Sequence, residues 1–172
     1  MNVKNNKRRR ESQEKIERAF IELLQTHEIK DITVSDLIKT TELNRSTFYA
    51  NYIDIFDLAD KTREKLEDEF SNLFADYDYF NERVGALKMF THIKENQIFY
   101  KTYFKLCYDE KFLISIYDKK RAEKEQIDNN LKYHIEFFRN GLNAIIKLWL
   151  ASGCQESPEE MAEVLKQEYR GR

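Results

Sequence analysis

Glycine and proline are scarce in this chain. Four glycines and one proline make 5 of 172 residues, about 3%, whereas average usage is about 12%. This scarcity excludes collagen-like and low-complexity chains, and it argues against a β-sandwich, which needs a turn residue about every 8–12 positions. Charged residues make up 35% of the chain and hydrophobic residues 41%. The composition therefore predicts an all-α protein that is long enough to bury a core.

Long apolar runs are also missing, since none approaches the about 18 residues that a membrane span requires. The polar, basic start of the chain lacks the apolar stretch of a secretory signal. The two cysteines, Cys107 and Cys154, fit no metal-ligand spacing, and His27, His92 and His134 fit neither a metal site nor a catalytic triad. We therefore expect a cytoplasmic protein away from the membrane, which is not an enzyme and needs no cofactor or metal.

The net charge of −2 conceals an uneven distribution. Residues 1–65 hold 13 basic and 12 acidic side chains, a net charge of +1, and residues 66–172 hold 16 and 19, a net charge of −3. Residues 1–10 contain five basic side chains and no acidic one. This segment is either an arm that contacts DNA phosphates or a solvated, frayed terminus. The candidate phosphate contacts are Lys7, Arg8, Arg9 and Arg10.

Apolar spacing and capping residues predict four helices in the first part of the chain. The first covers about residues 12–27. Thr33, followed three positions later by Asp36, starts a short helix over about 34–40 in a capping-box pattern. After a turn at 41–43, Asn44 caps a third helix over about 45–51. Asp54 then caps a long helix that reaches about residue 76.

The two short helices and their three-residue turn predict a helix-turn-helix over residues 33–52, inside a DNA-binding domain at 11–53. In that motif the second helix enters the major groove, and its N-terminal residues reach base edges. Arg45 can contact guanine with two hydrogen bonds, and Asn51 can pair with adenine or bind phosphate. Ser46, Thr47 and Tyr49 offer hydroxyl groups to bases or backbone. From these residues alone, a purely structural three-helix module is an equally good interpretation.

Residues 54–172 are predicted to form a second helical domain, with helices over about 82–94, 97–108, 111–122, 131–151 and 158–169, which brings the total to about nine helices. Of 23 aromatic residues, 18 follow residue 65. They predict either a bulky core or a cavity for a small-molecule effector. The candidate cavity residues are Phe99, Tyr100, Tyr103, Phe104, Tyr108, Phe112, Tyr117, Tyr133 and Phe137.

A long helix predicted over about 131–151 is apolar on two adjacent faces, which must therefore be covered on two sides. One side can be the core and the other a partner subunit, or both can be core in a monomer. One stripe, with two residues of the last helix at about 158–169, gives the candidate dimer interface: Leu131, Ile135, Phe138, Leu142, Ile145, Trp149, Met161 and Leu165. The adjacent stripe is His134, Phe137, Gly141, Ala144, Leu148 and Ala151, and the pattern leaves open which stripe meets the partner.

The segments Ile32-Thr33-Val34-Ser35-Asp36-Leu37 and Ser46-Thr47-Phe48-Tyr49, followed by Asn51-Tyr52 and Asp54, resemble the helix-turn-helix of the TetR family of transcriptional regulators. The segments Gly141-Leu142, Ile145-Ile146, Trp149-Leu150, Gly153 and Ser157-Pro158-Glu159-Glu160-Met161 are similar to one subset of that family. The resemblance implies a homodimer with N-terminal DNA-binding domains, helical ligand-sensing domains, and DNA contacts at Thr33, Ser35, Arg45, Ser46, Thr47, Tyr49 and Asn51.

Two positions depart from the family pattern. Glu42 stands where many members have a small residue, often glycine, and Ile55 stands where many have a lysine near phosphate. We expect a ligand-responsive repressor that binds a pseudo-palindromic operator in double-stranded DNA as a homodimer, with a possible small-molecule effector. The alternative is a helical adaptor or co-activator with the same fold and weak or no DNA binding of its own.

Overall fold

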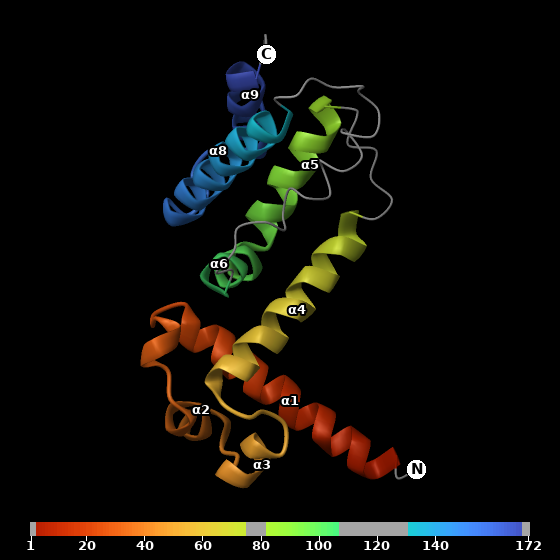
Figure 1. Ribbon diagram of the computed structural model, residues 1–172, viewed down its shortest axis with the longest axis vertical. Coiled ribbons are helices and arrows are strands. Elements are labelled where there is room, and N and C mark those ends of the chain that lie inside the picture. The colour runs from red at the N-terminus through yellow and green to blue at the C-terminus, as the bar shows by residue number, and fades with distance from the viewer. Residues whose placement is uncertain (1–2, 75–81, 107–130, 170–172) are drawn as a thin grey trace. The chain divides into compact units, whose positions relative to one another are not determined.

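The computed structural model describes residues 3–74, 82–106 and 131–169 (Figure 1). The regular structure of these residues is helical, which confirms the predicted all-α class. The helix predicted at about 111–122 lies outside the described residues. The elements are α1 (Val3–Leu24), the short 3-10 helix η1 (Ile29–Asp31), α2 (Val34–Thr41), α3 (Arg45–Tyr49), α4 (Ile55–Phe74), α5 (Glu82–Glu95), α6 (Gln97–Leu106), α8 (Leu131–Ala151) and α9 (Pro158–Tyr169).

The chain divides into two compact units, residues 1–70 and residues 71–172. The first unit extends beyond the predicted boundary at residue 53, because much of α4 belongs to it. Leu58 and Ala59 of α4 are buried. Lys65 of α4 donates a hydrogen bond to Glu17 Oε2 of α1 over 2.8 Å. These contacts make the first turns of α4 part of the N-terminal unit.

Helix α1 supplies one wall of the core of the first unit. Ile16, Ala19, Phe20 and Leu24 recur at helical spacing and are all buried. Helix α1 packs against α2, and α2 packs against α3. The other large buried side chains of this unit include Leu37, Phe48 and Leu58.

The basic N-terminal segment is part of α1, which begins at Val3 rather than near residue 12. The helix continues through it because the segment contains no proline or glycine and because two of its cations have a glutamate four positions further along. Lys7 and Glu11 lie 3.9 Å apart, and Arg10 and Glu14 lie 3.5 Å apart, both as i,i+4 pairs. The prediction of a separate arm or a frayed end is therefore wrong for residues 3–10, which are helical.

The caps of α2 and α3 are those that the sequence predicts. Thr33 accepts from the Asp36 backbone N–H (3.2 Å), and Asp36 accepts from the Thr33 N–H (3.1 Å), forming a reciprocal capping box. Glu42 ends α2 in the left-handed conformation with φ of 58°. Helix α3 ends at Tyr49, two residues earlier than predicted, and the Asn51 side chain donates to the Thr47 carbonyl (2.8 Å) just beyond that end.

In the second unit α5 packs against α9, and α6 packs against both α8 and α5. Phe90 of α5 and Trp149 of α8 meet edge to face in the core, with ring centroids 5.5 Å apart. Helix α8 ends at the predicted place, since Gly153 has φ of 77° and the Cys154 N–H bonds to the Trp149 carbonyl over 2.8 Å. Ser157 and Glu160 cap α9 reciprocally.

No helix in the described ranges has the length and apolar character needed to cross a membrane. The same residues contain no cluster of three or more His, Cys, Asp or Glu side chains that could hold a metal ion.

Candidate nucleic-acid interface

Helix α3 presents several of the predicted DNA contacts on its outer face. Phe48 is buried and packs edge to face against Tyr49, with centroids 5.4 Å apart. The burial of Phe48 fixes the rotation of α3 about its own axis. Arg45 and Ser46 are consequently exposed, and Tyr49 keeps 58% of its surface open. The helix is thus anchored on one side and displays polar side chains on the other.

The structure brings together Arg45 of α3 and Ser35 of α2, two of the predicted contacts. The Arg45 Nη2 donates to Ser35 Oγ over 2.7 Å. A guanidinium has five N–H donors, so this bond leaves donors for a bidentate contact to guanine. Ser35 therefore orients Arg45 along the outer surface of the helix-turn-helix.

The Asn44 side chain organises the first turn of α3, a role that extends beyond the predicted cap. Its Oδ1 accepts from the Thr47 backbone N–H (2.8 Å), from the Thr47 hydroxyl (2.8 Å) and from the Ser46 hydroxyl (2.7 Å). Because both hydroxyl groups donate their protons to Asn44, the oxygens of Ser46 and Thr47 can act only as acceptors toward other groups. Acceptors suit the amino groups of adenine and cytosine, whereas phosphates offer no donor.

Thr33 is exposed, but its hydroxyl is engaged in the capping box. It donates to Asp36 Oδ2 over 2.5 Å and accepts from the Asp36 N–H. These bonds from Thr33 hold the pKa of the Asp36 carboxyl below its ordinary value. A role of Thr33 in DNA contact stays a prediction, since its established place in the structure is at the start of α2.

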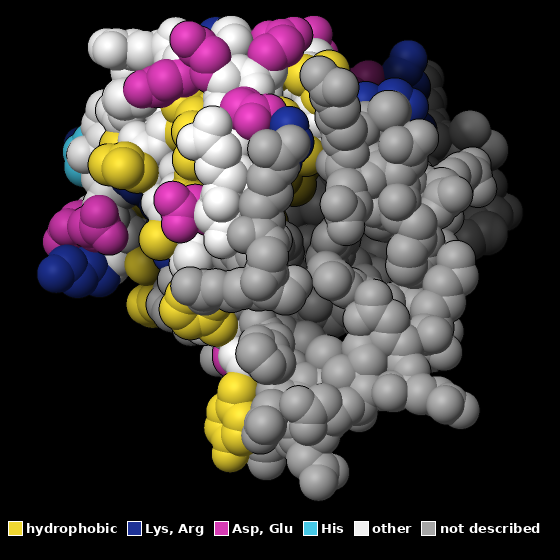
Figure 2. Space-filling model, turned by 90° about the horizontal axis from the view of Figure 1, so that it is seen from above, with side chains coloured by type: hydrophobic (Ala, Val, Ile, Leu, Met, Phe, Trp, Pro, Cys, Tyr) yellow, Lys and Arg dark blue, Asp and Glu magenta, His cyan; other side chains and the backbone are white. Residues whose placement is uncertain are grey.

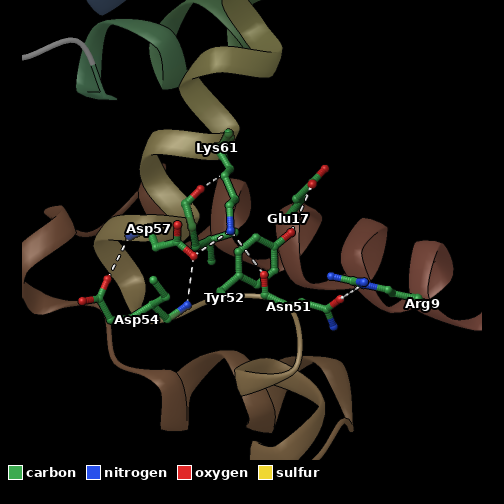
Figure 3. Close-up of polar contacts among 10 residues, drawn as sticks. Arg9, Glu17, Asn51, Tyr52, Asp54, Asp57 and Lys61 are labelled. Carbon is green, nitrogen blue, oxygen red and sulfur yellow. Dashed lines mark hydrogen bonds and ion pairs between the residues drawn. The ribbon is translucent and has the colours of Figure 1, made fainter.

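Asn51 does not lie on the outer face, and the prediction that it pairs with a base is wrong in this respect. Only 9% of its surface is exposed. Its Oδ1 accepts from Arg9 Nε (3.1 Å), and its Nδ2 donates to the Thr47 carbonyl (2.8 Å). Figure 3 shows Asn51 between α1 and α4, facing Arg9. The residue follows the end of α3, where the chain turns back toward the core.

The four predicted phosphate contacts in α1 are exposed but have different neighbours. Lys7 and Arg10 lie opposite Glu11 and Glu14, whereas Arg9 reaches the end of α3. The Arg8 backbone carbonyl accepts from the Ser12 hydroxyl over 2.9 Å. The helical conformation thus distributes these cations around α1, with Lys7 and Arg10 on one face and Arg9 on another.

Lys61 of α4 is a cation near α3 that the sequence analysis did not single out. Its Nζ lies 2.8 Å from Asp57 Oδ2, 3.4 Å from the Asn51 carbonyl oxygen and 5.3 Å from the centroid of the Tyr52 ring. The i,i+4 spacing of Asp57 and Lys61 was the available signal. Ile55, at the position where many family members have a lysine, is buried.

Asp54 and Asp57 place negative charge at the start of α4. Asp54 accepts from the Asp57 N–H (2.8 Å), and Asp57 accepts from the Ile53 N–H (2.9 Å), which caps the helix. The Lys61 ammonium and the Ile53 N–H hold the pKa of Asp57 below its ordinary value. The Asp57 carboxylate therefore remains charged at neutral pH, within the same unit as α3.

Tyr52 and Glu17 join the end of the helix-turn-helix to α1. The Tyr52 hydroxyl donates to Glu17 Oε1 over 3.2 Å, and Lys65 pairs with the other oxygen of the same carboxylate. Burial and the Glu17 charge raise the pKa of Tyr52 above its ordinary value, so the hydroxyl stays a donor. The ion pair with Glu17 likewise raises the pKa of Lys65.

The predicted aromatic cavity of the second unit is supported only in part. Tyr100 and Tyr103 are buried, and Phe99 and Phe104 are half-buried. Tyr133 and Phe137 are instead on the surface, so their placement in an enclosed cavity is wrong. They are exposed because they lie on the side of α8 opposite the core residues Leu142 and Ile146. The candidates Tyr108, Phe112 and Tyr117 lie outside the described residues.

Tyr100 has a polar partner inside the second unit. Its hydroxyl lies 2.7 Å from His92 Nδ1, and the two rings meet edge to face. Burial lowers the pKa of His92, which favours a neutral imidazole. These contacts agree with the interpretation of the aromatic residues as a bulky core.

The structure also corrects the predicted dimer interface. Leu142, Trp149 and Met161 are buried inside their own unit, and Trp149 is only 2% exposed. They cannot at the same time face a partner subunit. Ile145 and Leu165 are half-buried, and the side chains of Leu131, Ile135 and Phe138 lie outside the described part.

The adjacent stripe of α8 is the exposed one. Leu148 keeps 74% of its surface open and Phe137 62%, and Ala144 lies between them on the same face. Val164 of α9 is also exposed. Figure 2 shows hydrophobic side chains open on the surface beside acidic ones. Among the described residues of α8, the exposed apolar stripe is therefore the second one.

A helix-turn-helix with an outward-facing second helix, followed by a separate helical unit, defines a helical regulator of transcription. Residues 81–170, which are 90 of the 172 residues, match the family model of the transcriptional regulator C-terminal region of TetR type, TetR_C_8. The chain therefore belongs to the TetR family of transcriptional regulators, and it is a regulator rather than an enzyme.

The chain is similar to a named relative in Lactococcus lactis subsp. lactis, the HTH-type dhaKLM operon transcriptional activator DhaS, with 33% identity over 99 residues. The match includes 54% of this chain and 49% of the relative, so the chain spans about half the length of that curated protein. A solved structure of the dihydroxyacetone kinase operon activator DhaS has the same fold, with a TM-score of 0.55 and 22% identity over 91% of this chain and 93% of that chain.

Proposed function

We propose that this protein regulates transcription by binding a pseudo-palindromic DNA site as a homodimer. The observation that carries the proposal is the outer surface of α3. The buried Phe48 anchors this helix, while Arg45, Ser46 and Tyr49 are exposed and Thr47 is half-buried. Side chains at the start of a recognition helix are the ones that reach base edges in the major groove. The residues on this surface carry the donors and acceptors that base reading requires.

In this proposal, the hydrogen bonds within the helix-turn-helix determine whether each side chain donates a hydrogen bond to DNA or accepts one from it. Arg45, held by Ser35, donates to the O6 and N7 atoms of a guanine. Ser46 and Thr47 accept from base amino groups, because their own protons are bound to Asn44. Tyr49 offers an exposed ring and hydroxyl to the groove wall, and Thr33 and Ser35 approach the DNA from the start of α2.

The homodimer is supported by the exposed stripe of Phe137, Ala144 and Leu148 on α8, and Val164 of α9 is a further exposed apolar side chain of the same unit. Large exposed apolar side chains in one row are typical of a protein interface. Two subunits joined there would present two copies of α3 to successive major grooves, whose centres lie about 34–36 Å apart.

In this proposal, the position of the DNA site relative to the promoter decides whether the protein activates or represses transcription. Sequence analysis favoured a repressor, whereas the printed name of the L. lactis relative is that of an activator. We infer that activation is as open to this fold as repression and depends on the distance between site and promoter. A small molecule or partner bound by the second unit would regulate DNA binding by favouring one of two dimer arrangements.

Selection of binding sites from random duplex DNA by the purified full chain tests this function. We expect a palindrome whose half-sites are centred about one helical turn, or a multiple of it, apart. A reporter with the recovered palindrome near a promoter then separates activation from repression by the sign of the change. A folded, dimeric protein that enriches no sequence would contradict the proposal.

A second candidate function is an adaptor without DNA affinity of its own. The observation in its favour is the negative charge of Glu42, Asp54 and Asp57, which border the helix-turn-helix and repel phosphates. Retention on mixed-sequence DNA at low salt separates the two functions. A regulator with its own DNA affinity is retained and elutes as salt rises, whereas an adaptor passes through.

A further inference from the structure

One basic residue of α1 is hydrogen-bonded to the segment that directly follows α3, the proposed recognition helix. Arg9 Nε donates to Asn51 Oδ1 over 3.1 Å, although the two residues are 42 positions apart (Figure 3). Arg9 lies on the same helical face as Ile16, which is two turns further along α1 and buried in the core. Lys7, Arg8 and Arg10 point in other directions, so Arg9 is the predicted phosphate contact that faces α3.

Asn51 is held in one orientation. Its Nδ2 donates to the Thr47 carbonyl over 2.8 Å, its backbone N–H bonds to the Phe48 carbonyl over 2.9 Å, and its own carbonyl accepts from Lys61 over 3.4 Å. Because the amide nitrogen must face the Thr47 carbonyl, the amide oxygen must face Arg9. The acceptor for Arg9 is thus fixed by the end of α3 itself.

The bond to Asn51 leaves the outer edge of the Arg9 guanidinium open. A guanidinium bound through Nε still carries the N–H donors of its two Nη groups. In the described ranges no acidic side chain pairs with Arg9, whereas Lys7 and Arg10 each lie opposite a glutamate. Arg9 is also exposed. An oriented, exposed guanidinium matches the geometry of a phosphate, which it can bind with two parallel hydrogen bonds.

We propose that Asn51 is a positioning residue that presents Arg9 to a DNA backbone phosphate beside the C-terminal end of the recognition helix. Arg9 then supplies a contact that is independent of base sequence and fixes the register of α3 in the groove. The neighbouring cations of α1 add general positive charge without a fixed contact. The inference depends on the proposed DNA binding of the helix-turn-helix.

The salt dependence of binding to a mixed-sequence 30-base-pair duplex tests the inference, with fluorescence anisotropy as the readout. Each phosphate contact contributes about 0.9 to the slope of log K against log salt concentration. We expect Arg9→Gln to reduce the slope by about one for each bound subunit, and thus by about two for a bound homodimer. Arg10→Gln is the matched control, since it removes the same charge one residue away, and we expect a change of less than about half a unit.

Substitution of Asn51 separates positioning from simple support of the fold. Asn51→Ala removes no charge, yet we expect it to reduce the slope as Arg9→Gln does. The double variant Arg9→Gln/Asn51→Ala is expected to bind no more weakly than Arg9→Gln alone, because the two residues act as one unit. A purely structural Asn51 would instead add its own loss to that of Arg9. Circular dichroism checks folding, and if Asn51→Ala does not fold, the Arg9 and Arg10 variants still decide the inference.

The outcomes distinguish this inference from the proposed function. If the wild-type protein does not bind the duplex at low salt, DNA binding and the role of Arg9 both fail. If the wild type binds and Arg9→Gln keeps its slope, or if Arg10→Gln loses as much, the inference about Arg9 is overturned and the proposed function stands.

Discussion

At the scale of single residues, the turn between α2 and α3 contains an unfavourable backbone conformation. Glu42 has φ of 58° and ψ of 19°, in the left-handed region. For a residue with a β-carbon this conformation costs about 1–2 kcal/mol, whereas glycine adopts it readily. The position is the one at which many family members have a small residue, so the departure noted in the sequence has a measurable physical effect.

Replacing Glu42 with glycine is expected to raise the free energy of unfolding by up to about 1 kcal/mol. Relief of the left-handed strain exceeds the about 0.5–1 kcal/mol that a glycine loses through its greater freedom in the unfolded chain. Urea denaturation measures the change. Glu42→Ala is the control, since it removes the same charge but keeps the β-carbon, and it should give no gain. An equal gain in both variants would assign the effect to charge.

The carboxylates at the starts of α2 and α4 make the stability of the first unit sensitive to acid. The Thr33 bonds lower the pKa of Asp36, and the Lys61 and Ile53 bonds lower that of Asp57, both from an ordinary value of 3.8. A carboxyl whose pKa is lowered by folding stabilises the protein fully above its unfolded pKa. That stabilisation is lost as the pH falls through the lowered, folded value.

We therefore expect the free energy of unfolding of the wild type to fall as the pH drops below about 4. The double variant Asp36→Asn/Asp57→Asn should be less stable at neutral pH and should lose less on acidification, because neither side chain titrates. Urea denaturation between about pH 2 and 7 measures both curves. Parallel curves for the two proteins would show that other groups dominate the acid response.

At the scale of elements, α8 has two apolar faces with different neighbours. Leu142, Ile146 and Trp149 pack inside the second unit, and the face with Phe137 and Leu148 is open. A large apolar side chain that keeps most of its surface open indicates a partner. Helix α8 thus contributes to the core on one side, and its other side is the proposed dimer interface.

Leu148→Glu is expected to convert the homodimer to a monomer at micromolar concentration, because it places a charge in an apolar contact. Analytical ultracentrifugation measures the mass, and thermal unfolding checks the fold. Gln155→Glu is the matched control, since it adds the same charge to an exposed position of the second unit that lies outside α8, and it should leave the dimer intact. A dimeric Leu148→Glu protein would place the interface elsewhere.

At the scale of the whole molecule, the proposed DNA binding depends on two helix-turn-helix units acting together. In that proposal each unit alone reads one half-site, and a dimer formed through the α8 surface would make the second binding event intramolecular. The family assignment rests on the second unit, whereas the candidate base-reading residues lie in the first. The proposed function therefore requires both units of this chain and a second copy of it.

Leu148→Glu should consequently bind a single half-site as well as the wild type does, but lose at least about tenfold in affinity for the full palindrome, because the avidity of two linked sites is gone. Electrophoretic mobility shifts with matched half-site and full-site duplexes measure both. A loss of equal size on both duplexes would show damage to the recognition surface instead of the dimer.

Much of the fold follows from local sequence signals. The capping residues Thr33, Asn44 and Ser157 and the terminating Gly153 are where the sequence analysis placed them, because a cap is satisfied by backbone groups only a few residues away. The start of α1 was predicted too late. The basic composition of its first turns was interpreted as an arm, whereas helical i,i+4 ion pairs support the helix there.

The candidate site was predicted less completely. Arg45, Ser46 and Tyr49 lie outward as expected, but Asn51 belongs to the interior and Lys61 was missed. Both errors arise from contacts between segments far apart in the chain: Arg9 with Asn51, and the Lys61 ammonium with the Asn51 carbonyl. Spacing along one helix carries no information about such pairs.

The sequence by itself determined that this protein is helical, that it contains a helix-turn-helix, and where several of its helices are capped, since these properties depend on periodicity and on neighbours within one turn. Only the tertiary structure decided which apolar face of α8 is open and which polar side chains of α3 face outward. Which of these side chains are exposed depends on packing between segments that are far apart in the sequence. Two residues of equal polarity, Asn44 and Asn51, accordingly have opposite positions, one exposed at a helix start and one buried against Arg9.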